Sequence, residues 1–247
     1  MPLSEQLALI EIVLVSPRNP LNIGAAARAM ANFGFERLTV VAPYEPHWRE
    51  AKSAVGAEGL LQNAKRAERV EDAVAACTFV IGTGTLERRR PEQRGVRLPE
   101  LAPIIEQELA RGGRVALVFG PEKRGLTRVD FSLCHLLVEI PTDARQPSMN
   151  LGQAVAVCLY ELSSRLLAAG PAPLPEADAE KRADSAQLEL LAGAIEETMA
   201  AANYSPAEMS AANRHDVRVL LRRLALGERD ARRILGLFRR VLWRLRH

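Results

Sequence analysis

Four loops of this sequence follow short apolar runs and contain residue types that bind polar ligands. The first loop comes after Ile10–Val15 and contains the motif Asn-Ile-Gly-Ala-Ala-Ala-Arg at positions 22–28. Asn22 can cap a helix whose small residues allow close packing, and Arg28 lies about a turn and a half further along. A well-capped helix with one surface arginine explains these residues equally well. The loop lacks the GxGxxG spacing of a dinucleotide fingerprint, which disfavours ordinary NAD binding.

The second loop is Gly82-Thr83-Gly84-Thr85, and it follows the apolar run Thr78–Gly82. Small residues at a strand end expose backbone N–H and C=O groups, which can hold an adenine or a ribose. An arginine cluster able to contact phosphates comes next, at Arg88, Arg89, Arg90, Arg94 and Arg97. A flexible basic surface loop is an equally good explanation of this cluster taken alone.

The third and fourth loops are shaped by glycine and proline. Phe119–Leu126 (Phe-Gly-Pro-Glu-Lys-Arg-Gly-Leu) follows a strand and has a glycine at both ends of a tight turn. Ile140-Pro141 begins a polar loop that ends in Gln-Pro-Ser-Met-Asn-Leu at positions 146–151. A helix is expected to begin there, so Ser148 or Asn150 can act as its cap.

The elements that must hold these loops alternate between strand-like and helix-like segments. Short β-branched apolar runs indicate strands at Ile10–Val15, Leu38–Ala42, Thr78–Gly82, Val115–Phe119 and Leu136–Ile140. Helical patterns occur at Asn22–Phe33, Glu71–Cys77, Leu98–Arg111 and Asn150–Leu167. Continuous apolar strands separated by helices predict the α/β class, with a mostly parallel sheet covered by helices on both faces. Ligands of such sheets bind at the carboxyl ends of the strands, where the four loops lie.

Composition and cysteine usage exclude several other classes. The chain is 48% hydrophobic and 26% charged, as ordinary globular proteins are. Its three cysteines, Cys77, Cys134 and Cys158, form no CxxC pair, which argues against a disulfide framework or a structural zinc site. The four histidines are scattered, so no metal site is expected, and His135 within a strand-like run is expected to be structural. There is no basic leader and no run long enough to span a membrane, so we expect a cytoplasmic protein.

The chain changes character near residue 170. We expect a domain at residues 1–169, a linker at 170–184 that begins Gly-Pro-Ala-Pro-Leu-Pro, and a helical extension at 185–247. Helical patterns in the extension run over about Ser185–Ala202, Ala207–Ala225 and Glu228–Arg246. Leu220, Leu224, Leu235, Phe238 and Leu242 are expected to pack these helices together.

Positive charge is concentrated at the end of the chain. From Tyr204 to His247 there are eleven arginines, no lysine and four acidic residues, a net charge of +7, so residues 1–203 carry −4. Such asymmetry favours contact with a polyanion. The alternative is a solvated helix face whose arginine stems cover apolar surface.

Taken together, the four loops carry a family resemblance that each alone does not. NxGAxxR after the first strand, the Gly-Thr loop, VFGxExxGL, and IPxxxxxxSxNL at the start of a long helix resemble the SPOUT RNA methyltransferases. The similarity is greatest to the TrmJ branch of tRNA 2′-O-methyltransferases, covers about residues 8–165, and extends to the short helical tail. It implies a deep trefoil knot near the end of the α/β domain, a homodimer, and S-adenosylmethionine as methyl donor.

The resemblance also assigns site residues by motif match. The cofactor pocket would be lined by Thr83, Gly84, Thr85, Gly120, Ile140, Pro147, Ser148 and Met149. The reaction centre would hold Asn22, Arg28, Glu122, Ser148 and Asn150. Four positions depart from the family pattern: Gly84-Thr85 replaces a more usual Ser-Ala, Met149 a Leu, and Pro121 an Arg or Asn. Pro121 also removes one backbone donor.

The implied reaction is transfer of a methyl group to a ribose 2′-OH, which only RNA offers, so tRNA is the expected partner and DNA is not. Arginine is a poor general base. We therefore expect Arg28 to orient a substrate phosphate and to stabilise charge on the attacking oxygen, while the proton leaves through that phosphate or water. Arg88, Arg89, Arg90 and Arg94 would contact RNA phosphates. The resemblance implies a pyrimidine at tRNA nucleotide 32; the alternatives are a methyltransferase acting on ribosomal RNA and a non-catalytic RNA-binding protein.

Overall fold

A computed structural model describes residues 2–86, 91–169 and 180–247. Its centre is a seven-stranded sheet in the order β3-β2-β1-β6-β4-β7-β5, in which all neighbouring strands are parallel. The strands are β1 Ile10–Val15, β2 Arg37–Val41, β3 Lys65–Ala67, β4 Phe79–Thr83, β5 Gly95–Arg97, β6 Val115–Phe119 and β7 Leu136–Glu139. The expected α/β class and five of these strands are confirmed. The two unpredicted strands, β3 and β5, are short edge strands that carry charged residues.

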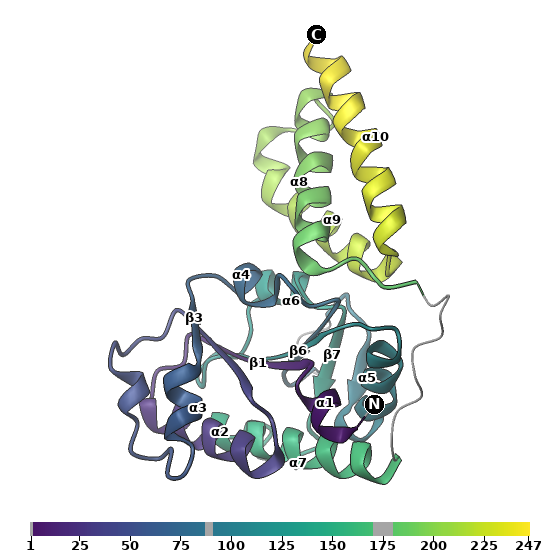
Figure 1. The fold of residues 1–247 in the computed structure, drawn as a ribbon. Helices are drawn as coiled ribbons and strands as arrows, with labels where there is room; N and C mark the ends of the chain where they lie inside the picture. Colours follow the sequence, from purple (N-terminus) through teal and green to yellow (C-terminus); the bar gives the residue numbers. More distant parts are fainter. Residues whose placement is uncertain (1, 87–90, 170–179) are drawn as a thin grey trace.

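Helices cover both faces of the sheet (Figure 1). On one face α2 (Pro20–Phe33) and α7 (Leu151–Ala169) pack against each other, with α5 (Leu101–Ala110) beside α7. The short helices α4 (Val70–Val74) and α6 (Arg128–Ser132) cover the opposite face. Each face has its own buried apolar cluster, and the central strands β1, β4 and β6 contribute side chains to both. The remaining helices of the domain are α1 Leu3–Leu7, α3 Glu58–Asn63 and the 3₁₀ turns η1 Trp48–Glu50 and η2 Leu98–Glu100.

The predicted cap of α2 is wrong. The helix begins at Pro20, and Asn19 is its cap, because the Asn19 side chain accepts a hydrogen bond of 3.0 Å from the Leu21 backbone N–H. Proline fits the first helical position, where no backbone donor is needed. Asn22 therefore lies inside the first turn, and its carboxamide is free to contact other loops. The predicted cap at the start of α7 is confirmed for Asn150, whose Oδ1 accepts from Gly152 N at 2.9 Å.

The helical extension contains α8 (Ser185–Ala201), η3 (Ala207–Met209), α9 (Ser210–Leu224) and α10 (Glu228–Arg246), and it projects from the α4–α6 side of the sheet (Figure 1). It has a buried cluster of its own. Leu235, Phe238 and Leu242 pack in this bundle as predicted. The prediction is wrong for Leu220 and Leu224, which are 41% and 53% exposed.

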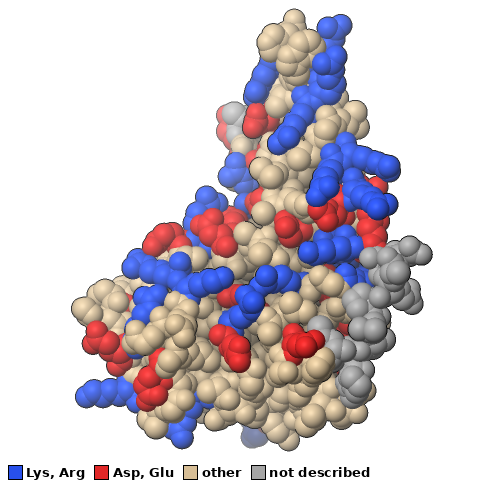
Figure 2. Space-filling view, in the orientation of Figure 1, with Lys and Arg blue, Asp and Glu red and all other residues tan. Residues whose placement is uncertain are grey.

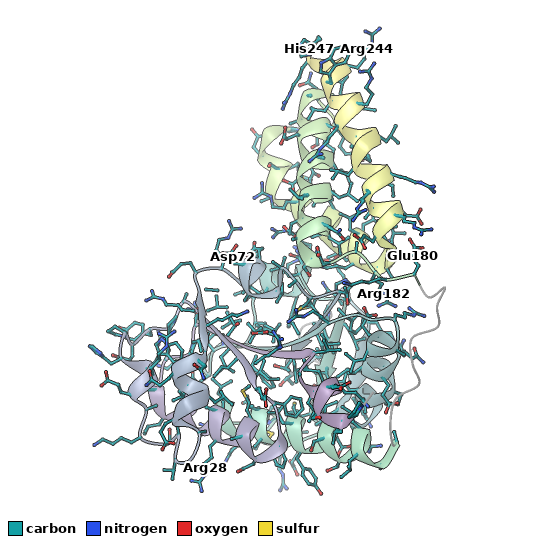
Figure 3. The ribbon with its side chains drawn as sticks, viewed as in Figure 1. Arg28, Asp72, Glu180, Arg182, Arg244 and His247 are labelled. Atoms are coloured by element: carbon teal, nitrogen blue, oxygen red, sulfur yellow. The ribbon has the colours of Figure 1, made fainter. Side chains whose placement is uncertain are left out.

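Buried polar contacts attach the extension to the α/β domain. Arg218 donates from Nη2 to Glu71 of α4 at 3.0 Å, which joins the extension to the domain. Within the extension, Arg222 donates from Nη2 to Glu189 of α8 at 3.0 Å. Both arginines are less than one-tenth exposed. Arg182 lies at the junction of the two parts (Figure 3) and pairs with the buried Glu108 of α5 at 3.2 Å. Two arginines of the basic segment thus hold the fold together instead of facing solvent.

The rest of the basic segment is exposed. Basic side chains run along the projecting extension, while acidic side chains gather near its base (Figure 2). Seven exposed arginines come from α10, at positions 229, 232, 233, 239, 240, 244 and 246. In the described part of the chain, no helix has the length and apolar character needed to cross a lipid bilayer.

Candidate functional site

A cavity of about 330 Å³ opens where the loops after β4, β6 and β7 meet. All eight residues that the sequence assigned to a cofactor pocket line it: Thr83, Gly84, Thr85, Gly120, Ile140, Pro147, Ser148 and Met149. Glu122, which the sequence assigned to the reaction centre, lines it as well. Sequence reasoning missed eight further lining residues: Phe119, Pro121, Lys123, Arg124, Gly125, Thr142, Leu151 and Ala154. Phe119 is the last residue of β6, and Leu151 is the first residue of α7. Their place at this edge of the sheet is the one feature of the sequence that could have assigned them to the cavity.

The loop between Gly120 and Leu126 forms one wall of the cavity, and glycine is required at both of its ends. Gly125 has a φ of +63°, and its N–H donates to Pro121 O at 2.8 Å. The turn brings the Leu126 backbone nitrogen so close to Gly120 that an added Cβ at Gly120 would lie 2.2 Å from it. The two glycines predicted to frame a tight turn therefore do so, one through its backbone angle and one through close approach.

Side chains from three distant segments meet beside this cavity. Asn22 donates from Nδ2 to Glu122 Oε1 at 2.7 Å, and Asn150 donates from Nδ2 to Asn22 Oδ1 at 2.9 Å. The Asn150 Oδ1 in turn accepts the N–H of Gly152, so the orientation of each carboxamide is determined by its partners. We call Asn22, Glu122 and Asn150 the amide–carboxylate cluster. It joins the start of α2, the Gly120–Leu126 loop and the start of α7.

Glu122 is held in its ionised form. Partial burial opposes ionisation, but hydrogen bonds from Asn22 and from backbone N–H groups outweigh it and lower the pKa of Glu122. The backbone donors are Arg18 N at 3.3 Å and Asn19 N at 3.4 Å. Both precede the first turn of α2, where the helix dipole also favours an anion. A carboxylate with a lowered pKa is suited to orienting donors and poorly suited to taking a proton from a ribose hydroxyl.

The structure brings Ser148 to the cavity but not Arg28. Ser148 lines the cavity and is itself exposed. Arg28 is exposed on α2, outside the residues that line the cavity, and Figure 3 shows it at the foot of the α2–α7 layer, pointing away from the sheet. Leu21 lies two helical turns earlier on the same face of α2 and is 54% exposed. Within one chain, the expected reaction centre therefore lacks its arginine.

Of the four arginines expected to contact RNA, the structure describes Arg94. Arg94 is exposed, and its backbone carbonyl accepts a hydrogen bond from Leu137 N of β7. Arg88, Arg89 and Arg90 lie outside the described residues.

A second cavity, of about 420 Å³, lies between the Gly120–Leu126 loop, α6 and the extension, and His215 of α9 lines it. Here Glu92 accepts from Arg128 Nη2 at 2.8 Å and contacts His215 Nε2 at 3.0 Å. Glu92, His215 and Asp216 offer ligand atoms within 4.8 Å of one another. The guanidinium of Arg128 already occupies the carboxylate that a metal ion would need, so the absence of a metal site stays our expectation.

His135 has the structural role that the sequence predicted, and the three cysteines are buried. His135 Nδ1 accepts from Val80 N at 3.1 Å, and burial lowers its pKa well below 6.5. Burial raises the pKa of each of the three cysteines to about 12, and all three are free thiols.

Comparison with known proteins identifies relatives of the α/β domain. A sequence model of the SpoU rRNA Methylase family matches residues 9–160, which is more than half of the chain. The tRNA (cytidine/uridine/adenosine-2′-O-)-methyltransferase TrmJ of Pseudomonas aeruginosa is 39% identical over 165 residues, 66% of this chain and 64% of that protein. The tRNA (cytidine-2′-O-)-methyltransferase TrmJ of Methanocaldococcus jannaschii is 38% identical over 163 residues, 64% of this chain and 68% of that protein. The matches thus span about two-thirds of the length of these relatives.

A solved structure resembles the chain over nearly its full length. The crystal structure of TrmJ from Z. mobilis ZM4 superposes with a TM-score of 0.81 at 30% identity, and it covers 94% of this chain and 98% of that one. The similarity therefore includes the helical extension as well as the α/β domain.

Proposed function

The chain belongs to the SpoU rRNA Methylase family, and we propose that it transfers a methyl group from S-adenosylmethionine to a ribose 2′-OH of tRNA. One observation carries this proposal. The cavity at the carboxyl ends of β4, β6 and β7 adjoins the amide–carboxylate cluster, so a bound cofactor and a set of oriented polar groups would share one site. A non-catalytic RNA-binding protein would need neither.

The lining of the cavity fits this cofactor. Phe119, Ile140 and Met149 offer apolar surface for a purine, and the hydroxyl of Thr85 can contact a ribose. When bound, S-adenosylmethionine supplies an electrophilic methyl group on a sulfonium. The residues that would hold it are Thr83, Gly84, Thr85, Gly120, Ile140, Pro147, Ser148 and Met149.

The remaining chemistry is positioning and charge stabilisation by this chain's own side chains. In our proposal the ionised Glu122 orients Asn22, and Asn22 and Asn150 hold each other beside the cavity. Ser148 is placed to contact the attacking hydroxyl. Arg28 stabilises the negative charge that develops on that oxygen and orients a substrate phosphate, and the proton leaves through the phosphate or water.

We propose that Arg28 reaches this site from a second copy of the chain. Leu21 on α2 and Val157, Tyr160 and Leu167 on α7 are exposed on adjoining helices, an apolar surface that flanks Arg28. A symmetric dimer formed through this α2–α7 face would bury these side chains. In such a dimer each Arg28 would lie in the interface and face the partner chain.

Mixed dimers test the role of Arg28 and the dimer together. Arg28→Ala is expected to abolish methyl transfer while cofactor affinity, measured by calorimetry, stays unchanged. Asn150→Ala is expected to be inactive as well. Co-expression of the two variants is expected to restore activity that neither has alone, because one cavity in each mixed dimer then has all its groups. No rescue, with mixed dimers present, would show that Arg28 acts within its own chain.

The nucleotide that is modified is the finer part of the proposal. We propose a pyrimidine at nucleotide 32 of the tRNA anticodon loop, although the names of the two relatives differ in the bases they include, with adenosine in one and cytidine alone in the other. Mass spectrometry of tRNA from a deletion strain is expected to show loss of one 2′-O-methylated ribose at that position. A loss confined to ribosomal RNA would favour the rRNA alternative.

Three further features complete the proposal. The chain would form the deep trefoil knot of SPOUT enzymes around the segments that follow β6 and β7, and a crystal structure that traces residues 79–165 would test this. The protein would act in the cytoplasm, where tRNA is processed. Residues 1–169 and 185–247 would form separate structural units joined by residues 170–184.

A further inference from the structure

A third cavity, of about 360 Å³, lies next to the proposed cofactor cavity and is not used by the mechanism above. It opens at the carboxyl ends of β1 and β2, and the two cavities are separated by one segment, because Pro121, Lys123 and Arg124 line both. Glu122 of the amide–carboxylate cluster belongs to this shared segment. Whatever binds in the third cavity therefore lies directly beside the reaction centre. We call it the Tyr44 cavity, after the one aromatic residue among the described residues that line it.

Its walls are built at some cost in backbone energy. Ser16 and Ala42, which directly follow β1 and β2, have φ angles of +44° and +41°. Left-handed conformations are unfavourable for residues other than glycine, because Cβ comes too close to the following carbonyl oxygen. Ser16 N donates to Val41 O at 2.8 Å, and Tyr44 N donates to Pro17 O at 3.2 Å, so the two loops are tied together in this shape. Such strain is concentrated where a particular loop geometry is needed for function.

The chemistry of the Tyr44 cavity is aromatic and cationic. Tyr44 is 71% exposed, and the Arg18 guanidinium lies 5.7 Å from the centre of its ring. Lys123 and Arg124 add two more cationic groups to the lining, which contains no carboxylate among the described residues. An exposed aromatic ring beside several cations is the arrangement with which proteins bind unpaired nucleotides, the base stacking on the ring and the phosphate pairing with the cations.

We infer that the Tyr44 cavity binds the nucleotide adjacent to the methylated one in the RNA substrate. Its base would stack on Tyr44, and its phosphate would contact Arg18 and Lys123. This inference rests on the proposed function, because the shared segment at Glu122 makes the occupant of the Tyr44 cavity a neighbour of the reacting ribose. Stacking accepts any base, so the cavity would contribute affinity and register more than sequence choice.

Substitutions at Tyr44 test this inference. Tyr44→Ala is expected to lower kcat/KM for tRNA by roughly 5- to 100-fold, the range that loss of one base–aromatic stack produces, mainly through KM. Tyr44→Phe keeps the ring and is expected to stay near wild type, while Tyr44→Leu is expected to resemble Tyr44→Ala. Tyr204, which is 72% exposed on the extension, provides a matched control, and Tyr204→Ala is expected to change nothing. Cofactor affinity is expected to be unchanged in all four variants.

The cations are tested by salt dependence. Arg18→Ala is expected to reduce the slope of log affinity for tRNA against log salt concentration by about one unit, since one phosphate contact is lost. Its backbone N–H contact to Glu122 is retained in this variant.

Several outcomes would overturn the inference. An unchanged kcat/KM for tRNA in Tyr44→Ala would do so. An equal loss of kcat/KM in Tyr44→Phe and Tyr44→Ala would do so as well. A parallel loss of cofactor affinity would indicate a structural role for Tyr44 instead. Failure of the proposed function looks different. If the wild-type protein methylates no RNA, fluorescence titration with tRNA still reports whether Tyr44→Ala weakens binding.

Discussion

Glu122 accepts hydrogen bonds from three donors at the start of α2: the backbone N–H groups of Arg18 and Asn19 and the side chain of Asn22. An ionised carboxylate can accept from all three. Two of the donors are backbone N–H groups, at Arg18 and Asn19, which cannot reverse their polarity. A neutral amide at position 122 would present an NH₂ group to at least one of them. The motif pattern in the sequence was enough to predict that Glu122 and Asn22 belong together. The backbone donors could not be predicted, because their direction depends on where α2 begins.

Glu122→Gln is therefore expected to lower kcat for methyl transfer by about tenfold or more, the effect of losing hydrogen bonds to a charged acceptor. Because its pKa is lowered, Glu122 is expected to stay ionised above pH 6. The methylation rate of the wild type is therefore expected to show no dependence on pH from this carboxyl in that range. Circular dichroism and thermal unfolding serve as the control that the variant is folded. Full activity in a folded Glu122→Gln protein would contradict a positioning role for the charge.

At the scale of elements, the basic C-terminal segment divides into two classes of arginine. Arg218 and Arg222 of α9 are buried, and Glu71 of α4 and Glu189 of α8 supply their counter-charges. The arginines of α10 remain exposed. The charge content predicted a basic tail, and the helical patterns predicted its three helices. Neither could separate the two classes, because which face of α9 meets α4 depends on the docking of the extension. The same limit explains why Leu220 and Leu224 were wrongly placed in the core.

Glu189→Gln is expected to destabilise the protein by about 3–5 kcal/mol, because it leaves the buried Arg222 without its counter-charge and Arg218 with Glu71 alone. A control exists on the same helix. Glu197 pairs with Arg246 where both side chains are more than half exposed, so Glu197→Gln is expected to cost about 0–1 kcal/mol. Urea unfolding of the two variants measures the difference. Equal stabilities would mean that the buried ion pairs between α8 and α9 do not stabilise the extension.

At the scale of the whole molecule, His135 lies where the sheet and the extension meet. Burial lowers its pKa, and the positive charges of Arg222 and Arg182 act in the same direction. Its ring packs against Phe79 of β4, with centroids 5.3 Å apart. The sequence predicted a structural histidine within a strand-like run. It did not indicate that Arg182, which directly precedes the extension, and Arg222 of α9 would lie nearby, since both are distant along the chain.

The stability of the folded protein is therefore expected to fall as the pH drops below about 6.5, the ordinary pKa of histidine. Above that pH His135 is neutral in both states. Below it, His135 is protonated in the unfolded chain but stays neutral in the folded chain until the pH reaches the lowered pKa. Protonation therefore favours the unfolded state over this range of pH. Tm measured from pH 7.5 to 5 is expected to decline more steeply in the wild type than in His135→Asn, which keeps an acceptor for Val80 N–H. Parallel curves would exclude His135 as the source.

The segment Gly120–Leu126 borders three cavities at once: the proposed cofactor cavity, the Tyr44 cavity, and the cavity that includes His215 of the extension. Arg124 lines all three. A ligand that orders this segment from one side reduces the conformational-entropy cost of ordering it when a second ligand binds on another side. Thermodynamic linkage makes such cooperativity reciprocal, so whatever factor the cofactor adds to RNA affinity, RNA adds to cofactor affinity.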